Sequence, residues 1–484
     1  MRARPLTLVL FVLAVALQGV AAAQPPPQPA PPQPGEWRLA GSDREAYAME
    51  AKGKATDAEG AAMSLRCVNP QSTGFGTVAT SVPADAYRGR PVTLAAEVQT
   101  AGVKGGATLW LRIDAGEKML LLENGLDQPL RGDTPWARRA VTLPVPADAT
   151  SLVFGVLIQA GGGSVTARNL RLEAGPALAA GGPIAPEAAK VLDAAIAVVK
   201  ENALRTNMVD WPKVEPEVRA FAAGASKPSD VYPAINMLLA KLGDNHSHFM
   251  PPAATSQFKS GGAQNPPADV RTLPDGVGYI GVPAYGGVNA EAGKAYARRA
   301  HQAIADVKSS APCGWVVDLR TNGGGNMWPM LSGLRPFVGD GLLGSFERGN
   351  GESTKWTAAD TRFDVAPAAA LRGLESAWVA VLTGPRTASS GEFVTIAFRG
   401  RPRTRSFGLP TAGLSTSNST FPLPDGSMIL LTTAVGADRT GTRYGTEIEP
   451  DEVVNGVEPA WPGDDPTLAA AVRWLKQSSG CGKN

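Results

Sequence analysis

Short runs of alternating hydrophobic and polar residues dominate the chain between residues 91 and 174. Five of them are PVTLAAEVQT, GATLWLRIDA, RAVTLPVP, SLVFGVLIQAG and SVTARNLRLEA. Turn residues separate these runs at close intervals, and a period of two is typical of strands with one buried face. The pattern therefore predicts an all-β region over residues 37–175, of the β-sandwich class.

The period of the pattern changes after the linker PALAAGGPI at residues 176–184. APEAAKVLDAAIAVVKENAL and PSDVYPAINMLLAKLG have helical spacing and are rich in strong helix formers. These two segments predict a helical subdomain over residues 185–256.

Strand and helix patterns alternate from about residue 268 to the end of the chain. GVGYIGVPAY, CGWVVDLRTN, SAWVAVLTGP and SMILLTTAVG have strand composition, whereas AEAGKAYARRAHQAIADVK and GEFVTIAFRG have helical composition. Such alternation predicts an α/β domain over residues 268–484, of the kind that carries catalytic sites.

The first 23 residues have the pattern of a secretory signal peptide. Arg2 and Arg4 precede an apolar run, and AAA precedes Gln24 as a small-residue cleavage site. An uncleaved membrane anchor is the alternative, although the apolar run is shorter than the ~20 residues that span a bilayer. Residues 24–36 are Pro-rich and predict an extended linker. We therefore expect an exported protein, periplasmic or secreted, whose mature chain has no membrane span.

Length, net charge and cysteine count further limit the classes of function to consider. A length of 484 residues predicts about two or three domains. The formal net charge is only +2, and removal of the leader brings it near zero, so no basic face for nucleic acid is expected. Three cysteines, Cys67, Cys313 and Cys481, leave at least one thiol outside any intrachain disulfide. Cys313 and Cys481 could pair, but the sequence leaves that open. Their spacing predicts no metal site.

Two polar segments carry candidate chemistry. In LGDNHSHF a helix pattern stops at Gly243, and His246 and His248 follow in a polar turn where an imidazole can move protons. In VVDLRTNGGGN an apolar strand pattern ends in three glycines, which leave backbone N–H groups uncovered for an oxyanion. The alternatives are an idle surface histidine, a tight turn, and a phosphate loop, but no lysine follows the glycines as a phosphate loop requires.

A third segment, VAVLTGPRTASSGEFVTIAF, predicts a strand, a turn and a helix. Ser389 and Ser390 lie at the start of the helix, where N–H groups point outward and stabilise negative charge. A structural N-cap is the alternative role for either serine. With the other two segments, this one supplies the base, the oxyanion loop and the nucleophile that acyl transfer requires.

In this order the segments resemble the S41 serine peptidases, which include the carboxyl-terminal processing and tricorn-core proteases. LGDNHSHF is similar to the family's LGDGHT, VVDLRTNGGGN to DLRxNxGG, TASSGE to SASxE, and GTEIEPDEVV to GxxPDxxV. The resemblance covers about residues 185–460 and implies a ClpP/crotonase-like α/β fold. It implies Ser389 as the nucleophile, with the amides of Ser390 and of Gly324 or Gly325 as the oxyanion hole.

The resemblance also implies how the serine is activated. The processing branch uses a lysine in GxPTxGKG, but this chain reads GLPTAGLS with Leu414 at that position. The tricorn-like branch uses a histidine, which His246 matches, and an orienting glutamate, for which Glu447 and Glu449 are the candidates. The supporting serine of that branch is Asn245 here. No cofactor or metal is implied.

The short stretch from Pro252 to Val270 leaves no room for the PDZ domain of the processing branch, so another surface must select the peptide or protein substrate. The β region resembles jelly-roll modules of carbohydrate-binding proteins, in which Trp110 and Trp136 would contact glycans, unless they pack in the core. Two alternatives to peptide hydrolysis remain at this point: an inactive member that binds a small hydrophobic ligand or peptide, and a glycan-active protein. Oligomeric state is not predicted.

Overall fold

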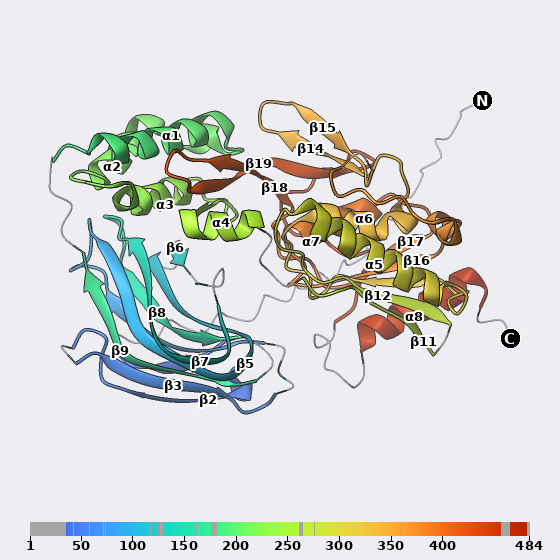
Figure 1. Ribbon diagram of the computed structural model, residues 1–484, viewed down its shortest axis with the longest axis horizontal. Helices are drawn as coiled ribbons and strands as arrows, with labels where there is room; N and C mark the ends of the chain where they lie inside the picture. Colours follow the sequence, from blue (N-terminus) through green and yellow to red (C-terminus); the bar gives the residue numbers. More distant parts are fainter. Residues whose placement is uncertain are drawn as a thin grey trace, which may run out of the picture. The chain divides into compact units, whose positions relative to one another are not determined.

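The structure is a computed structural model (Figure 1). It describes residues 35–41, 43–57, 59–70, 72, 74–116, 118–123, 125, 129–159, 162–175, 182–260, 265–274, 276–359, 361–455 and 465–481. The predicted signal peptide, nearly all of the Pro-rich linker and most of the linker at residues 176–184 lie outside these ranges. In the described residues no helix is both long enough and apolar enough to cross a membrane.

The N-terminal region is built from strands, as its alternating pattern predicts, and its described residues form nine of them. They are β1 (Arg38–Ala40), β2 (Tyr47–Lys52), β3 (Ala61–Cys67), β4 (Gly76–Pro83), β5 (Pro91–Ala115), β6 (Lys118–Glu123), β7 (Leu130–Pro144), β8 (Ser151–Ile158) and β9 (Ser164–Ala174). Pairing runs β7–β5–β9–β3–β2 through the first half of β5 and β6–β5–β8–β4–β1 through its second half.

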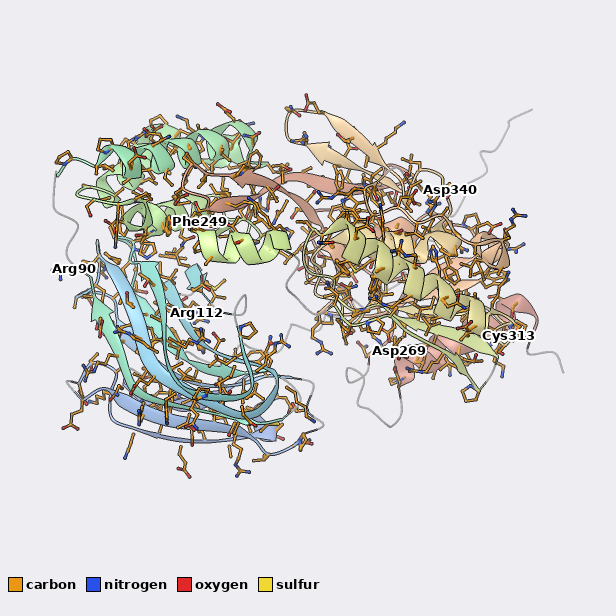
Figure 2. All side chains as sticks on the ribbon, viewed as in Figure 1. Arg90, Arg112, Phe249, Asp269, Cys313 and Asp340 are labelled. Atoms are coloured by element: carbon orange, nitrogen blue, oxygen red, sulfur yellow. A yellow bond between two sulfur atoms is a disulfide. The ribbon has the colours of Figure 1, made fainter. Side chains whose placement is uncertain are left out.

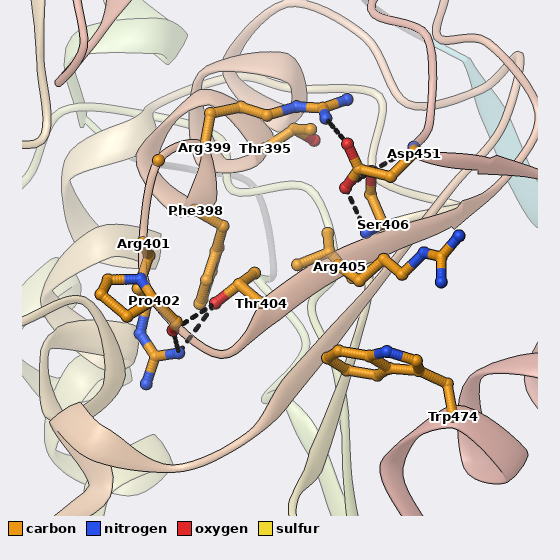
Figure 3. Close-up of a pocket in the computed structure, with 12 residues that line it drawn as sticks. Thr395, Phe398, Arg399, Arg401, Pro402, Thr404, Arg405, Ser406, Asp451 and Trp474 are labelled. Atoms are coloured by element: carbon orange, nitrogen blue, oxygen red, sulfur yellow. Dashed lines mark hydrogen bonds and ion pairs between the residues drawn. The ribbon is translucent and has the colours of Figure 1, made fainter. Parts of the chain in front are cut away.

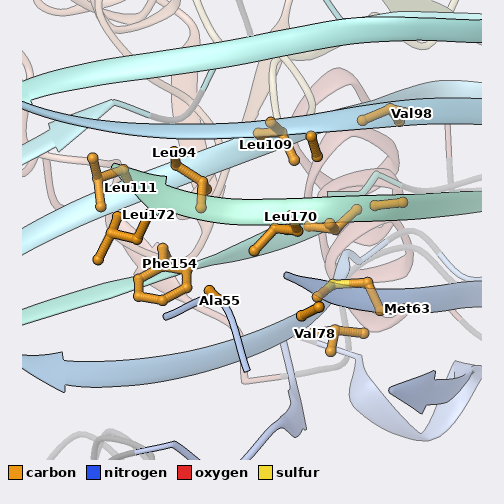
Figure 4. Packing of buried hydrophobic residues seen from close by; sticks show 14 of the residues in the cluster. Ala55, Met63, Val78, Leu94, Val98, Leu109, Leu111, Phe154, Leu170 and Leu172 are labelled. Carbon is orange, nitrogen blue, oxygen red and sulfur yellow. The ribbon is translucent and has the colours of Figure 1, made fainter. Parts of the chain in front are cut away.

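The long strand β5 replaces two strands that the sequence pattern predicts at residues 91–100 and 106–115. Gly102 and Gly106 lie between its halves with φ of 61° and 139°, so the chain bends there without ending the strand. Leu94 and Leu111, one from each half, belong to the same buried cluster as Phe154 (Figure 4). One core shared by two half-sheets is the arrangement of a β-sandwich.

The helical segment is formed by α1 (Pro186–Asn202), α2 (Trp211–Phe221), α3 (Tyr232–Ala240) and α4 (Pro252–Ser260). Apolar residues of α1, α2 and α3 form one core with Leu423, Ile429 and Leu431 from the far end of the chain. The helices therefore pack against a strand that arrives from the α/β region, and this contact positions the loop after α3.

The α/β region is built on a six-stranded sheet in the order β11–β12–β13–β16–β17–β20. Its strands are β11 (Asp269–Leu273), β12 (Val277–Gly281), β13 (Trp315–Asp318), β16 (Val379–Thr383), β17 (Thr404–Gly408) and β20 (Glu452–Val453), and all neighbours except β11 and β12 are parallel. Its helices are α5 (Ala290–Lys308), α6 (Met327–Val338), α7 (Ser390–Phe398) and α8 (Pro466–Ser479).

Both faces of this sheet are buried. Trp315 and Val317 of β13 pack in the cluster that contains α5, α6 and α7, whereas Val316 packs in the cluster that contains α8. Because side chains alternate along a strand, three consecutive apolar residues need a helix layer on each side. The ribbon shows these two layers on opposite sides of the sheet (Figure 1).

A second, antiparallel sheet connects the helical segment to the α/β region. It contains β10 (His248–Met250), β14 (Gly344–Arg348), β15 (Ser353–Trp356), β18 (Thr416–Pro422) and β19 (Met428–Asp438). The strand β19 pairs with β10 near its start and with β14 near its end. It thus brings the loop after α3 next to the loops of the parallel sheet.

Candidate active site

The loop that carries His246 is folded by a short carboxylate-centred turn. Asp244 accepts hydrogen bonds from the backbone N–H of His246 at 3.1 Å and of Ser247 at 2.9 Å. Asn245 has a φ of 52°, a left-handed conformation that asparagine tolerates better than most residues. This conformation accounts for an asparagine where the related motif has glycine.

Strands β18 and β19 fix the same loop from the other side. Asn418 donates from Nδ2 to the carbonyl of His246 at 2.8 Å, and Thr432 donates its backbone N–H to the hydroxyl of Ser247 at 3.0 Å. The position of the imidazole therefore depends on residues about 170–190 positions away in the sequence.

Ser389 lies at the tight turn between β16 and α7. Its φ of 51° and ψ of −118° are strained for a residue with a Cβ. Thr387 donates its hydroxyl to the carbonyl of Leu319, and Ala388 donates its N–H to the carbonyl of Asn322. These bonds hold the turn against the loop after β13, so the packing of two neighbouring strand ends maintains the strain.

The structure brings His246 and Ser389 into direct contact. His246 Nε2 lies 3.0 Å from Ser389 Oγ, although the residues are 143 positions apart. The other ring nitrogen, Nδ1, lies 2.7 Å from Thr416 Oγ1 at the start of β18. A hydroxyl within hydrogen-bond distance of an imidazole, whose second nitrogen is also held, is the geometry of an activated serine.

The electrostatic surroundings of His246 favour its neutral form. The pKa of His246 is lowered to about 4, mainly by burial and also by the charge of nearby His248, whereas Asp244 acts in the opposite direction. A neutral imidazole can accept a proton, so the ring is in its base form at neutral pH.

The three glycines lie beside the serine. A Cβ added to Gly324 would lie 2.8 Å from Ser389 Cβ, so only glycine allows this approach. The amide of Gly324 donates to Asn322 Oδ1 at 3.0 Å and is therefore already used. Among the described residues the amides of Gly325 and of Ser390, the first residue of α7, have no acceptor. Ser390 donates its hydroxyl to the carbonyl of Gly325 at 2.7 Å and joins the two segments.

Glu392 has a role that sequence reasoning did not assign beyond its motif spacing. Its carboxylate is fully buried in α7 and accepts four hydrogen bonds. The donors are the amide of Ser389 at 2.8 Å, the hydroxyl of Thr411 at 2.5 Å, the amide of Gly413 at 3.0 Å and the amide of Leu414 at 2.8 Å. Burial raises the pKa of Glu392, and these hydrogen bonds act against that rise.

The glutamates expected to orient the histidine are placed differently. Glu447 and Glu449 are both exposed, and within the described residues neither side chain is hydrogen bonded to His246. The carboxylate of Glu447 lies instead against Gly413. Thr416, the first residue of β18, contacts Nδ1 in their place. No local sequence pattern indicates that β18 begins next to the ring.

The aromatic residues proposed for glycan contact have other partners. Trp110 is half-buried in β5 and donates its indole N–H to Thr77 Oγ1 at 2.8 Å. The guanidinium of Arg168 covers one face of Trp136 at 4.2 Å from the ring centroid. The positions of Trp110 and Trp136 therefore give no support for glycan binding, which remains a prediction.

A cavity of about 540 Å³ lies at the C-terminal end of α7, and Figure 3 shows the residues that line it. Ser389 precedes the first residue of the same helix. Arg399, Arg401 and Arg405 line the cavity together with Asp451 and Trp474. The N–H groups of Arg401 are directed to carbonyls and to Thr404, and Asp451 is bonded to Arg399 and Ser406. Arg401 and Asp451 therefore have partners within the chain, whereas Arg399 Nε is buried without one among the described residues. None of the predicted site residues lines the cavity.

The strand that leads to the glycine loop is tied to α8 at both ends. Cys313, labelled in Figure 2, precedes β13 and forms a disulfide with Cys481 after α8. Arg320 follows β13, is buried, and forms ion pairs with Asp318 at 2.6 Å and with Asp465, the N-cap of α8, at 2.8 Å. In the part of the chain that is described, no cluster of histidine, cysteine and carboxylate side chains is placed to hold a metal ion.

A parallel sheet whose strand ends bring together a strained serine, a histidine and uncovered amides is an arrangement used by acyl-transferring hydrolases. Residues 276–454 match the model of peptidase family S41, which confirms the predicted family resemblance for this segment. The matched segment includes every predicted site residue except His246.

Similarity to individual proteins extends further along the chain. A nisin-resistance protein of Lactococcus lactis subsp. lactis is 25% identical over 306 residues, which cover 60% of this chain and 88% of that protein. The structure of a lipoprotein from Streptococcus agalactiae superposes with a TM-score of 0.52 at 23% identity, covering 61% of this chain and 98% of the other. This likeness supports the fold of the region.

A shorter match links the chain to an uncharacterized HTH-type transcriptional regulator, YbfP, of Bacillus subtilis (strain 168). The two are 30% identical over 128 residues, which cover 26% of this chain and 43% of the regulator. The match covers less than half of either protein, so it adds nothing about the activity of the whole chain.

Proposed function

We propose that this protein is a serine peptidase that hydrolyses peptide bonds through an acyl-enzyme at Ser389, with His246 as the general base. One observation carries the proposal: the 3.0 Å contact between His246 Nε2 and Ser389 Oγ. The match to a peptidase family supplies the substrate class, peptides or proteins. The paired serine and histidine supply the chemistry.

In the proposed reaction His246 takes the proton from Ser389 as the serine oxygen attacks the peptide carbonyl carbon. The amides of Ser390 and Gly325 stabilise the oxyanion, and the loss of one such donor typically costs about 3 kcal/mol of transition-state stabilisation. The imidazolium then protonates the leaving amine as the C–N bond breaks. Water, deprotonated by the same imidazole, releases the acyl group as a carboxylic acid and restores the serine.

The strained turn contributes to this reaction by fixing the nucleophile. Because Ser389 cannot relax without breaking the contacts of Thr387 and Ala388 with the neighbouring loop, its hydroxyl stays directed at His246. Such preorganisation avoids the reorientation that an unstrained serine would need during attack.

Peptide cleavage by purified variants tests the proposal. Ser389→Ala and His246→Ala are each expected to lower kcat by about 100-fold or more. His248→Ala is the matched control, because it removes an exposed imidazole two residues away while Asn418 still holds the carbonyl of His246. Full activity in Ser389→Ala would refute the proposal. Peptide binding without cleavage by the parent would favour the alternative of an inactive binding protein.

We also infer that the protein is exported to the periplasm or secreted. The leader pattern at residues 1–23 supports export, and the disulfide between Cys313 and Cys481 is of a kind that persists in oxidising compartments. N-terminal sequencing of protein recovered from the cell envelope or medium is expected to begin near Gln24. A protein that retains its leader inside the cell would contradict this inference. Glycan binding by the N-terminal β region is not proposed.

A further inference from the structure

We propose that Thr416 is the positioning residue of the active site, and that its uncharged hydroxyl holds His246 where a carboxylate was expected. The inference rests on the proposed function, because it concerns the same serine and histidine. Among the described residues Thr416 is the side chain bonded to Nδ1, at 2.7 Å.

The contact at Nδ1 bears on which ring nitrogen of His246 is basic. A threonine oxygen has two lone pairs and can accept a hydrogen bond from Nδ1–H. With the proton on Nδ1, the lone pair on Nε2 points at Ser389 Oγ, which lies 3.0 Å away. The opposite tautomer would direct an N–H at the serine and could not remove its proton. As an acceptor at Nδ1, the hydroxyl of Thr416 would stabilise the tautomer that can act as a base.

The backbone on both sides of Thr416 is fixed, so its hydroxyl cannot drift. Thr416 pairs with Val435 of β19 at the start of β18. The preceding residue, Ser415, donates its hydroxyl to the carbonyl of Thr446 at 2.6 Å and accepts from the amide of Gly445 at 2.8 Å. Ser415 is completely buried. A β-branched side chain on such a backbone has few rotamers, which favours one hydroxyl position.

The contacts form a closed ring around the reacting atoms. Ser389 Oγ contacts His246, which contacts Thr416, and Leu414 two residues earlier donates its amide to Glu392 Oε2 at 2.8 Å. The same carboxylate oxygen accepts the amide of Ser389 at 2.8 Å. Displacement of Thr416 relative to the nucleophile would therefore stretch a buried, charge-assisted hydrogen bond.

Replacement of a carboxylate by a hydroxyl has a consequence for charge. The titratable groups on the elements around the imidazole are Asp244 and His248 in its own loop and strand, Glu392 in α7, and Glu447 after β19. Within the described residues no carboxylate oxygen of these groups is hydrogen bonded to the ring. Asp244 acts on the imidazolium only through space, without a hydrogen bond to the ring, so a carboxylate introduced at position 416 should stabilise it further.

Three substitutions of one residue test the proposal. Thr416→Val keeps the shape but removes the oxygen, and kcat is expected to fall about tenfold or more with little change in KM, since one hydrogen bond changes an equilibrium by about that factor. Thr416→Ser restores the oxygen and should recover activity to within about threefold of the parent. Thr416→Asp should move the acidic limb of the kcat/KM profile upward by at least about one pH unit.

These outcomes separate the inference from the proposed function. Thr416→Val with unchanged kcat, or Thr416→Asp with an unmoved acidic limb in a folded protein, would overturn the role of Thr416. The reaction would still stand if Ser389→Ala were inactive. Equal activity of Ser389→Ala and the parent would instead remove the proposed function. Melting temperatures of all variants, together with recovery in Thr416→Ser, distinguish a positioning role from general destabilisation.

Discussion

At the scale of single residues, His246 combines two hydroxyl contacts with a shielded ring. Ser389 lies at Nε2 and Thr416 at Nδ1, while burial keeps the imidazole neutral. A histidine in this state is ready to accept a proton but holds it weakly. The acidity of the medium should therefore affect the proposed reaction less than it affects a reaction that depends on an exposed histidine.

The pH dependence of kcat/KM follows from this state. The neutral form is the active base, and burial lowers the pKa of His246 to about 4. Activity should therefore persist from neutral pH down to about pH 5 and fall to half near pH 4, whereas an unperturbed histidine would give a midpoint near 6.5. Initial rates at low substrate concentration measure the profile. A midpoint at or above 6.5 would show that the ring is solvated and contradict the geometry.

Glu392 offers a second test at the residue scale. Glu392→Gln replaces one carboxylate oxygen by an NH₂ group, which would face backbone N–H donors that have no other partner. We expect the free energy of unfolding to fall by about 1–3 kcal/mol, with a large loss of kcat. Glu352→Gln, on the exposed turn before β15, is the matched control and should change neither quantity. An unchanged free energy of unfolding and an unchanged kcat in Glu392→Gln would contradict the proposed role of the hydrogen bonds to Glu392.

The residues of the site were only partly accessible from sequence. Ser389 and His246 could be chosen because their segments resemble family motifs and have the residue types that acyl transfer needs. Thr416 could not, because its proximity to His246 arises from the pairing of β18 with β19 and not from spacing. Glu447 and Glu449, which the family motif suggested for this role, are exposed, and in the described residues neither is hydrogen bonded to the ring.

At the scale of elements, the site depends on two turns at neighbouring strand ends. The loop after β13 supplies Gly324 and Gly325, and the turn after β16 supplies Ser389. Because β13 and β16 are parallel neighbours, their carboxyl ends meet at the same edge of the sheet. The close approach of the two turns requires a glycine at position 324.

Alanine substitution within the glycine loop tests that requirement. Gly324 has a φ of 102°, and its added Cβ would lie 2.8 Å from Ser389 Cβ and from the carbonyl oxygen of Ala388. Gly324→Ala should therefore displace the nucleophile and lower kcat by about 100-fold. Gly323→Ala is the adjacent control, because nothing lies within 4 Å of its added Cβ. Equal activity of the two variants would contradict the packing described.

Some elements could not be predicted because local signals opposed them. The sequence pattern predicts two strands where the structure has the single strand β5. Gly102 and Gly106 indicate a turn in the sequence, but in the structure the chain bends at them within one strand. Helix α6 contains Pro336 in its interior, which local propensity disfavours, yet burial of almost the whole helix stabilises it. Tertiary packing overrode propensity in both cases.

At the scale of the whole molecule, α8 braces the strand that leads to the glycine loop. The disulfide joins Cys481 after α8 to Cys313 before β13, and Asp465 at the other end of α8 pairs with Arg320. The disulfide closes a segment of 168 residues, so it restricts the unfolded chain strongly. The sequence allowed this pairing but could not select it.

Removal of the disulfide should lower global stability. Cys313→Ser with Cys481→Ser is expected to reduce the free energy of unfolding by about 2–5 kcal/mol. Chemical denaturation of the variant and the parent, both without reductant, measures the change. Cys67→Ser is the control, because its buried thiol is unpaired with another cysteine and donates to the carbonyl of Asn69, a bond that serine can keep. Equal stability of parent and double variant would contradict the bracing role.

Covalent labelling of the parent protein tests the central claim most directly. An alkyl fluorophosphonate reacts with a serine only when a base activates it. Peptide mass mapping is predicted to find one adduct, at Ser389, and no adduct in His246→Ala under the same conditions. An unlabelled parent, or labelling that is equally fast without the imidazole, would contradict activation of Ser389 by His246.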